Sequence, residues 1–208
     1  YREKRNQERA KKVVEETPQA PVLHALDNGK RIVLDLNRLK GLIESACAGL
    51  GADVKPEPIM AETMRNLYDG VPMDEVYKAS VLAARTLIEK DPDYTYATAR
   101  LLFHTMAKEA LGRDVVQADM AQAYVDYFPQ FIQQGVDNEL LDAKLLEFDL
   151  QRLGAALKAD RDLKFDYLGL QTLYDRYFLH IGKTRIELPQ AFFMRVAMGL
   201  SLNESDRE

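Results

Sequence analysis

The sequence predicts a mainly helical α+β protein of 208 residues, in which two small β-hairpins interrupt a succession of helices. Asn28-Gly29 lies between two apolar runs, and this dipeptide favours a two-residue hairpin turn because both central positions need positive φ. Apolar residues recur at helical spacing through most of the remaining chain, with Gly or Pro where helices should end. A second alternating run surrounds Gly182 and predicts another short hairpin.

The first predicted unit combines one hairpin with four helices. We expect strands near 22–27 and 30–34, then a helix capped by Asp35 or Asn37 that continues to about residue 49. The other helices are expected at 58–68, between Pro72 and Pro92, and at 93–111 with Gly112 as the terminator. The helix after Pro72 presents an apolar stripe made of Val76, Ala79, Leu82, Ala83 and Leu87. These elements suffice for a small α+β domain.

From Arg113 the pattern changes to helices alone. They are predicted at 115–134, 139–143, 147–157 and 166–176, with breaks at Gly135 and at the Asp/Lys-rich 158–164. The second hairpin follows at 177–187. A last helix begins at Pro189, a residue tolerated in the first helical turn, and carries an apolar stripe of Phe192, Phe193, Val196, Ala197 and Leu200.

The first 21 residues differ from the rest in composition. Residues 1–16 alternate charges with good helix formers and predict the end of a solvated helix. The two prolines of 17–21 predict a linker. Because the chain starts at Tyr1 inside a charged segment, we expect it to be a piece of a longer protein.

Composition excludes several classes of function. The formal net charge of −5 gives no general attraction for nucleic acid or an anionic membrane, and no apolar run has the length of a membrane span. Cys47 is the sole cysteine, so an internal disulfide, a redox pair or a cysteine zinc site cannot form. Together with the absence of a recognisable signal peptide, this predicts a cytoplasmic protein.

The residues alone reveal no catalytic or metal site. His24, His104 and His180 lie far apart in sequence, and each is interpreted as a core or boundary histidine. Cys47 is interpreted as a small buried hydrophobe. Tyr167, Tyr174 and Tyr177, at helical spacing, are interpreted as core aromatics. No phosphate-binding or hydrolase motif occurs, so catalytic and metal-binding residues are predicted to be absent.

Residues 165–204, FDYLGLQTLYDRYFLHIGKTRIELPQAFFMRVAMGLSLNE, closely resemble the N-terminal helical domain of class I ribonucleotide reductase large subunits. Residues 22–112 resemble the ATP-cone of the same enzymes through the hairpin, the "LYDGV" segment and the "PDYxYxxAR" helix. Residues 1–16 are similar to the last helix of a preceding ATP-cone. The resemblance therefore implies four parts: that helix (1–16), a linker (17–21), a second cone (22–112) and the helical domain (113–208).

The second cone departs from the family pattern at its effector site. The resemblance implies a Lys-Arg pair before the turn, where this chain has Leu26 and Asp27. Further family positions are occupied here by Ile32 for a Glu, Asp35 for an Asn, Arg38 for a Lys, Met73 for a Thr and Tyr77 for a His. Because a triphosphate needs cationic partners, we expect a degenerate site in which Arg38 and Lys108 keep useful charge. Weak or rearranged binding is the alternative.

The resemblance also implies a parent enzyme that reduces ribonucleotides to deoxyribonucleotides by radical chemistry. It implies ATP and dATP as effectors through the first cone, where Lys4 would be a remnant ligand, with no cofactor in this segment. The implied partners are a radical-generating small subunit, further large subunits and a thioredoxin- or glutaredoxin-type reductant. The rival hypotheses are a stand-alone ATP-cone regulator and a subunit-interaction module without catalysis.

Overall fold

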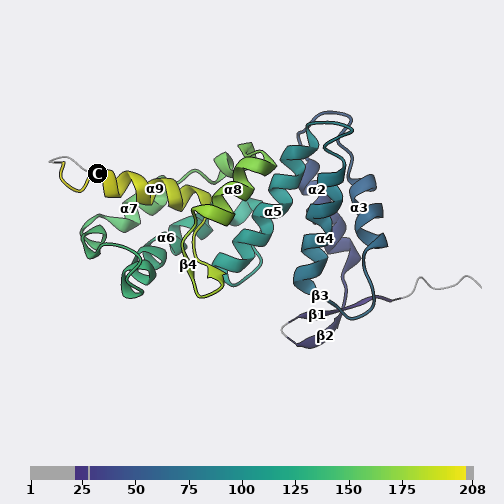
Figure 1. Ribbon diagram of the computed structural model, residues 1–208, viewed down its shortest axis with the longest axis horizontal. Coiled ribbons are helices and arrows are strands. Elements are labelled where there is room, and N and C mark those ends of the chain that lie inside the picture. The colour runs from purple at the N-terminus through teal and green to yellow at the C-terminus, as the bar shows by residue number, and fades with distance from the viewer. Residues whose placement is uncertain (1–21, 28, 205–208) are drawn as a thin grey trace, which may run out of the picture.

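The computed structural model describes residues 22–27 and 29–204, so the predictions for 1–16, for the linker 17–21 and for Lys4 lie outside the described residues. The described chain is mainly helical, as predicted, with two small sheets. Its elements form two halves side by side along the long axis of the molecule, and helix α5 lies between them (Figure 1).

The first sheet contains the predicted hairpin and one additional strand. β1 (His24–Asp27) pairs antiparallel with β2 (Lys30–Val33), with Ala25 opposite Ile32 and Leu26 opposite Arg31. β3 (Val71–Pro72) pairs parallel with the other edge of β1. β3 was not predicted, because a strand of only two residues leaves no alternating pattern in the sequence. The segment before β3 is held to β1 because Asp69 Oδ1 accepts a hydrogen bond from the backbone N–H of His24, at 2.9 Å.

Four helices follow the hairpin, as predicted: α2 (Leu36–Cys47), α3 (Pro56–Arg65), α4 (Met73–Thr86) and α5 (Tyr94–Leu111). Asp35 is the N-cap of α2, because its carboxylate accepts from the N–H of Arg38 at 3.0 Å. Gly112 ends α5 in the left-handed region, with φ 66°. Leu82, which the apolar stripe of α4 included, is 55% exposed because it faces a surface groove beside α3.

The second half begins with the 3₁₀ turn η1 (Gln117–Asp119) and the long helix α6 (Met120–Asp137). The predicted break at Gly135 is wrong, because this glycine lies inside α6. A Cβ at Gly135 would lie 2.5 Å from Leu141 Cδ1, and the Gly135 carbonyl accepts from the N–H groups of Leu140 and Leu141. The glycine therefore permits the returning chain to pack on the helix end.

The remaining elements differ from the prediction mainly in short turns. The helix expected at 139–143 does not form, and the 3₁₀ helix η2 (Ala143–Glu147) takes its place a few residues later. The segment 158–164 is not a plain loop but contains η3 (Ala159–Lys164). The other elements follow the predicted order: α7 (Leu150–Ala156), α8 (Tyr167–Arg176), the β4–β5 hairpin (His180–Ile181 with Thr184–Arg185) and α9 (Pro189–Leu200).

Helix α5 belongs to the packing of both halves. It packs against α2 and α4 of the first half and against α8, η3 and β5 of the second. Near its C-terminal end the Glu109 carboxylate accepts from the Tyr174 hydroxyl at 2.6 Å and from the Arg185 backbone N–H at 2.7 Å. Because α5 contributes buried side chains to both halves, the two halves share one continuous hydrophobic core.

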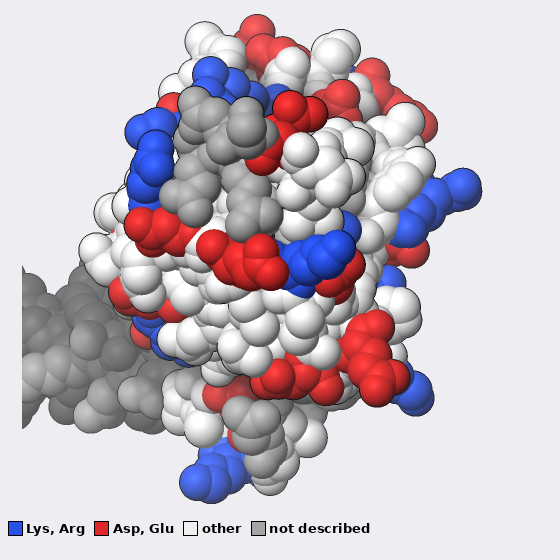
Figure 2. Space-filling view, turned by 90° about the vertical axis from the view of Figure 1, so that its left-hand side faces the viewer, with Lys and Arg blue, Asp and Glu red and all other residues white. Residues whose placement is uncertain are grey.

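Helix α9 buries its N-terminal end and exposes most of its apolar stripe. Pro189, Gln190 and Ala191 are buried, whereas Phe193 is 50% and Leu200 81% exposed. Figure 2 shows the side of the molecule at which the C-terminal end of α9 lies, and there charged side chains of both signs are scattered between uncharged areas. Among the described residues in that view, Lys and Arg do not gather into a continuous patch.

Measured over residues 22–27 and 29–204, every helix falls short of the length or the apolar character that a membrane span needs.

Candidate functional site

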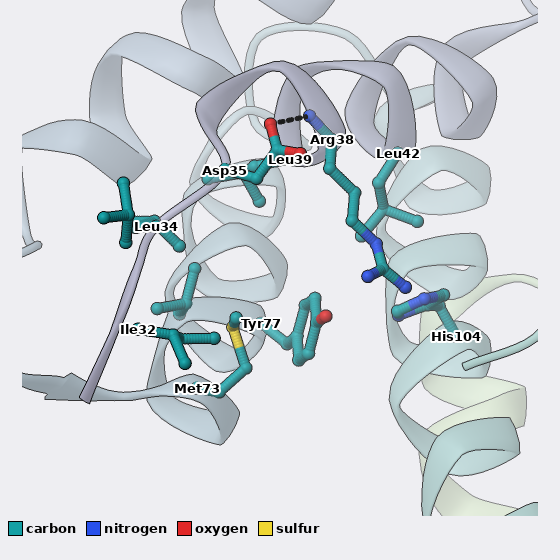
Figure 3. A pocket seen from close by; sticks show the side chains of 11 residues that line it. Ile32, Leu34, Asp35, Arg38, Leu39, Leu42, Met73, Tyr77 and His104 are labelled. Carbon is teal, nitrogen blue, oxygen red and sulfur yellow. Dashed lines mark hydrogen bonds between the residues drawn. The ribbon is translucent and has the colours of Figure 1, made fainter. Parts of the chain in front are cut away.

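The candidate site is a small cavity in the first half, with a volume of about 120 Å³. Strand β2 and helices α2, α4 and α5 surround it, and Figure 3 shows the side chains that point toward it. The lining is apolar on one side and polar on the other. The polar side chains are Asp35 and Arg38 from α2 and its cap, Tyr77 from α4 and His104 from α5.

The cavity collects most of the positions at which the sequence departs from the ATP-cone pattern. Ile32, Asp35, Arg38, Met73 and Tyr77 all contribute to the lining. Lys108 lies at its edge, with Nζ 4.8 Å from the centre of the Tyr77 ring. These residues come from segments up to 76 positions apart in sequence (Ile32 to Lys108), so the fold is what brings them together.

Leu26 and Asp27 lie differently from each other. Leu26 alternates with the buried Ala25 on β1, so it occupies the opposite face of the sheet and is 39% exposed. It does not line the cavity. The charge of Asp27 acts on Tyr77 and contributes to the raised pKa of that phenol. Of the pair that precedes the turn, Asp27 is therefore the residue with an electrostatic effect on the cavity.

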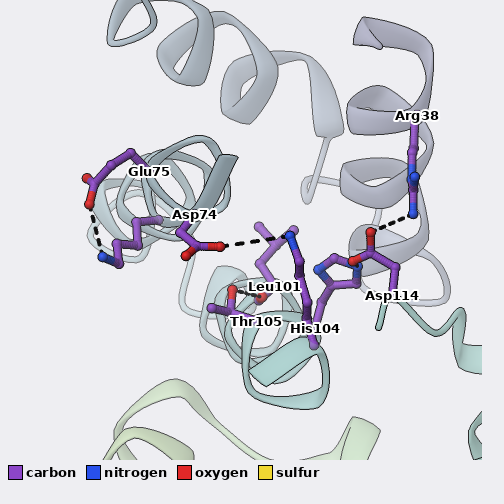
Figure 4. A network of polar contacts seen from close by, with 9 residues as sticks. Arg38, Asp74, Glu75, Leu101, His104, Thr105 and Asp114 are labelled. Atoms are coloured by element: carbon purple, nitrogen blue, oxygen red, sulfur yellow. Dashed lines mark hydrogen bonds and ion pairs between the residues drawn. The ribbon is translucent and has the colours of Figure 1, made fainter. Parts of the chain in front are cut away.

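Both predicted cations lie beside acidic side chains, and Figure 4 shows the pair formed by Arg38 and Asp114. Arg38 Nη2 lies 2.7 Å from Asp114 Oδ2, and Lys108 Nζ lies 3.8 Å from Asp74 Oδ1. The Arg38–Asp114 contact is a short, charge-assisted hydrogen bond, whereas the Lys108–Asp74 contact is a looser ion pair. The positive charge left at the site is thus largely matched within the chain.

His104 is the polar residue that the sequence did not single out for this site. Its ring lies 4.9 Å from the Tyr77 ring in an edge-on arrangement, and its Nε2 lies 3.5 Å from Asp114 Oδ1. Burial lowers the pKa of His104, Arg38 and Lys108 lower it further, and Asp114 opposes them. Burial also raises the pKa of Tyr77 to about 12. At neutral pH both side chains are therefore uncharged.

The charges around the cavity bear on whether it could hold a nucleoside triphosphate. Such a ligand carries about four negative charges and needs several cationic or N–H donors. Here Arg38 and Lys108 are paired with Asp114 and Asp74, while Met73 and Tyr77 line the cavity without a formal charge. Asp35 and Asp114 add negative charge beside Arg38.

The other candidates from the sequence lie outside this cavity. His24 Nδ1 lies 2.8 Å from Asp69 Oδ1, at the base of β1, and His180 is exposed on β4. Cys47 is buried, and burial raises its pKa to about 11. Tyr174 bonds to Glu109, but Tyr177 is 56% exposed rather than part of the core. In the part of the chain that the structure describes, no three His, Cys, Asp or Glu side chains form a group that could hold a metal ion.

Comparison with known proteins first defines the class of the last part of the chain. Residues 163–208 match the family described as "Ribonucleotide reductase, all-alpha domain". This match contains α8, the second hairpin and α9, which are the elements that carry the sequence resemblance.

The full chain is similar to ribonucleoside-diphosphate reductase large subunits. It is 38% identical to subunit alpha of Chlamydia muridarum, over 100% of this chain and 20% of that protein. It is 40% identical to subunit alpha of Chlamydia trachomatis serovar D over 86% of this chain and 17% of that protein, and 30% identical to the large subunit of Danio rerio over 84% and 22%. The chain therefore belongs to the ribonucleotide reductase large-subunit family, and it spans about a fifth of the length of these relatives.

Proposed function

We propose that this chain is the N-terminal regulatory and structural region of a ribonucleoside-diphosphate reductase large subunit. The parent enzyme would reduce ribonucleotides to deoxyribonucleotides by radical chemistry, for DNA synthesis. The names of the relatives and the family match support this proposal. In the parent, the partners would be a radical-generating small subunit, other large subunits and a thioredoxin- or glutaredoxin-type reductant. A single buried cysteine suits the reducing cytoplasm, where we place the enzyme.

Within the parent, we assign residues 22–112 to a degenerate ATP-cone and 113–208 to the helical domain. The observation that supports a degenerate cone is the internal pairing of the two remaining cations of the cavity, Arg38 with Asp114 and Lys108 with Asp74. A cone in this state would give the parent a rigid element rather than an effector sensor. ATP and dATP would then act through the preceding cone, to which Lys4 would belong.

The alternative of a stand-alone ATP-cone regulator has less support. A regulator of that kind needs no helical domain, whereas residues 163–208 match the reductase all-alpha domain. The similarity to reductase subunits also continues across the whole chain rather than ending with the cone. A role in subunit interaction remains compatible with the proposed function.

Isothermal titration calorimetry of the 208-residue chain with ATP and with dATP tests the proposal. We expect no saturable heat up to about 1 mM ligand, because the cavity lacks free phosphate partners. Micromolar affinity for either nucleotide would contradict the assignment of a degenerate cone. Circular dichroism of the same sample serves as the control that the chain is folded, since the described residues are mainly helical.

A further inference from the structure

Asp114 lies between the two halves of the chain, where it contacts side chains of two helices. It lies two residues beyond Gly112, which ends α5, and so belongs to the connection that leads to η1. Its Oδ2 accepts from Arg38 of α2 at 2.7 Å, and its Oδ1 lies 3.5 Å from His104 Nε2 of α5. Tyr77 of α4 is a further neighbour: its ring lies 4.9 Å from the His104 ring, and burial and the Asp114 carboxylate both raise the pKa of its phenol.

The surroundings fix this carboxylate in place. Gly112 turns the chain with φ 66°, and Val115, the next residue after Asp114, is only 7% exposed. The buried Val115 therefore anchors the connection directly after Asp114. Its side chain is 23% exposed, whereas that of Arg38 is 63% exposed, so the acid is the more firmly enclosed partner.

The contact made by Asp114 is the contact that a phosphate would make. Carboxylate and phosphate oxygens both accept charge-assisted hydrogen bonds from a guanidinium, and they compete for the same N–H groups. His104 Nδ1 and Asp114 Oδ1 are buried and have no hydrogen-bond partner among the described residues. The polar atoms around Arg38 thus form a site with unused hydrogen-bonding capacity, already occupied by one anion of the chain itself.

We propose that Asp114 is an internal anion that occupies the phosphate position beside Arg38 and excludes external polyphosphate from the cavity. This inference rests on the proposed function, in which the cavity is a degenerate effector site, and adds what keeps the site closed. The chemical class excluded is an inorganic or nucleotide polyphosphate. The element that closes the site is the connection between the two halves, so the state of the cavity depends on how that connection is held.

The test compares polyphosphate binding by the wild-type chain and by D114N, which keeps the shape of the side chain and removes its charge. The probe is inorganic triphosphate, measured by calorimetry without divalent cations. We expect D114N to bind it at least about tenfold more tightly than the wild type, because one charge-assisted contact to Arg38 is released. The matched control is D119N, which removes the same charge from the exposed last residue of η1, five positions further along the chain.

The outcomes separate this inference from the proposed function. Equal affinity of D114N and the wild type would overturn the inference, as would an equal gain in D119N, which would mean a general charge effect. In both cases the proposed function stands, because the wild-type chain still does not bind. Tight binding by the wild type would contradict both.

Circular dichroism verifies folding, and D114S replaces D114N if the latter fails to fold. The double variant D114N/R38Q should lose the gain.

Discussion

Asp162 is a carboxyl group buried in the C-terminal half among neutral hydrogen-bond donors. It is 1% exposed, and its oxygens accept from the Tyr124 hydroxyl at 2.7 Å and from the Gln190 amide at 2.8 Å. Burial raises its pKa to about 7, although both hydrogen bonds act in the opposite direction. The group joins η3, α6 and the start of α9, so its protonation state affects how these elements are held together.

The free energy of unfolding should therefore fall as the pH rises through about 7. The unfolded Asp has a pKa near 4, so between the two values the folded chain binds the extra proton, and this stabilisation disappears once the folded group ionises. From about pH 5.5 to about pH 8.5 we expect a loss of about 2 kcal/mol, measured by urea denaturation. D162N should flatten this dependence, whereas D119N should retain it. An unchanged slope in D162N would contradict the prediction.

Cys47 offers a second test at the level of one side chain. Burial raises its pKa to about 11, and the positive charge of Arg100 offsets this only in part. At pH 8 the thiolate fraction should be about 100-fold below that of a cysteine with the ordinary pKa of 9.0, and the thiolate is the form that reacts. We expect alkylation by iodoacetamide to be slow in the native chain and fast in urea. Rapid modification of the native chain would show that the thiol is accessible.

The sequence could identify some residues of the site but not their pairing. Arg38, Met73 and Tyr77 were found because the family pattern assigns a role to their positions. Asp114 and His104 were not, because their meeting depends on the left-handed turn at Gly112 and on the burial of Val115. Asp162 had no signal either, since its segment is rich in exposed charges and only the fold shows which of them is enclosed.

Two glycines provide a matched comparison at the level of helices. Gly112 terminates α5 with φ 66°, and Gly41 lies within α2; neither would meet another atom within 4 Å if a Cβ were added. G112A should therefore destabilise the chain by about 1 kcal/mol through backbone strain alone. G41A should stabilise it by about 0.5–1 kcal/mol, because alanine favours the helical backbone. Urea denaturation measures both changes, and equal signs for the two variants would contradict this interpretation.

Local chemistry predicted the long elements better than the short ones. The hairpin of β1 and β2, the Asp35 cap and the Gly112 terminator depend on neighbouring residues, so the sequence shows them directly. β3 exists because Val71 and Pro72 pair with β1, 46 positions earlier in sequence for both pairs. A glycine such as Gly135 is typical of a helix break, yet here it lies inside α6 and allows Leu141 to pack against the helix. Such elements are determined by tertiary contacts that periodicity does not contain.

At the level of the whole molecule, the chain should show no reductase activity. The proposed parent chemistry needs a radical-forming cysteine and a redox cysteine pair, and Cys47 is the sole cysteine, buried and poorly ionised. We expect no deoxyribonucleotide to form when the purified chain is incubated with ribonucleoside diphosphates, a dithiol and a reductase small subunit. A complete reductase serves as the positive control. Product formation would contradict the view that this region regulates rather than catalyses.

Restoring the family's cationic pair should not restore nucleotide binding. In L26K/D27R, the new Lys would extend from the sheet face opposite the cavity, because Leu26 lies on that face. Ile32, Met73 and Tyr77 would still occupy the lining, and Asp114 would still engage Arg38. Calorimetry with dATP should therefore detect no micromolar affinity in L26K/D27R.

Adding M73T and Y77H, which return the family residues to α4, should improve binding more than the first pair does, because these positions line the cavity. Micromolar binding by L26K/D27R alone would mean that the pair before the turn, and not the lining, decides whether the cone accepts a nucleotide.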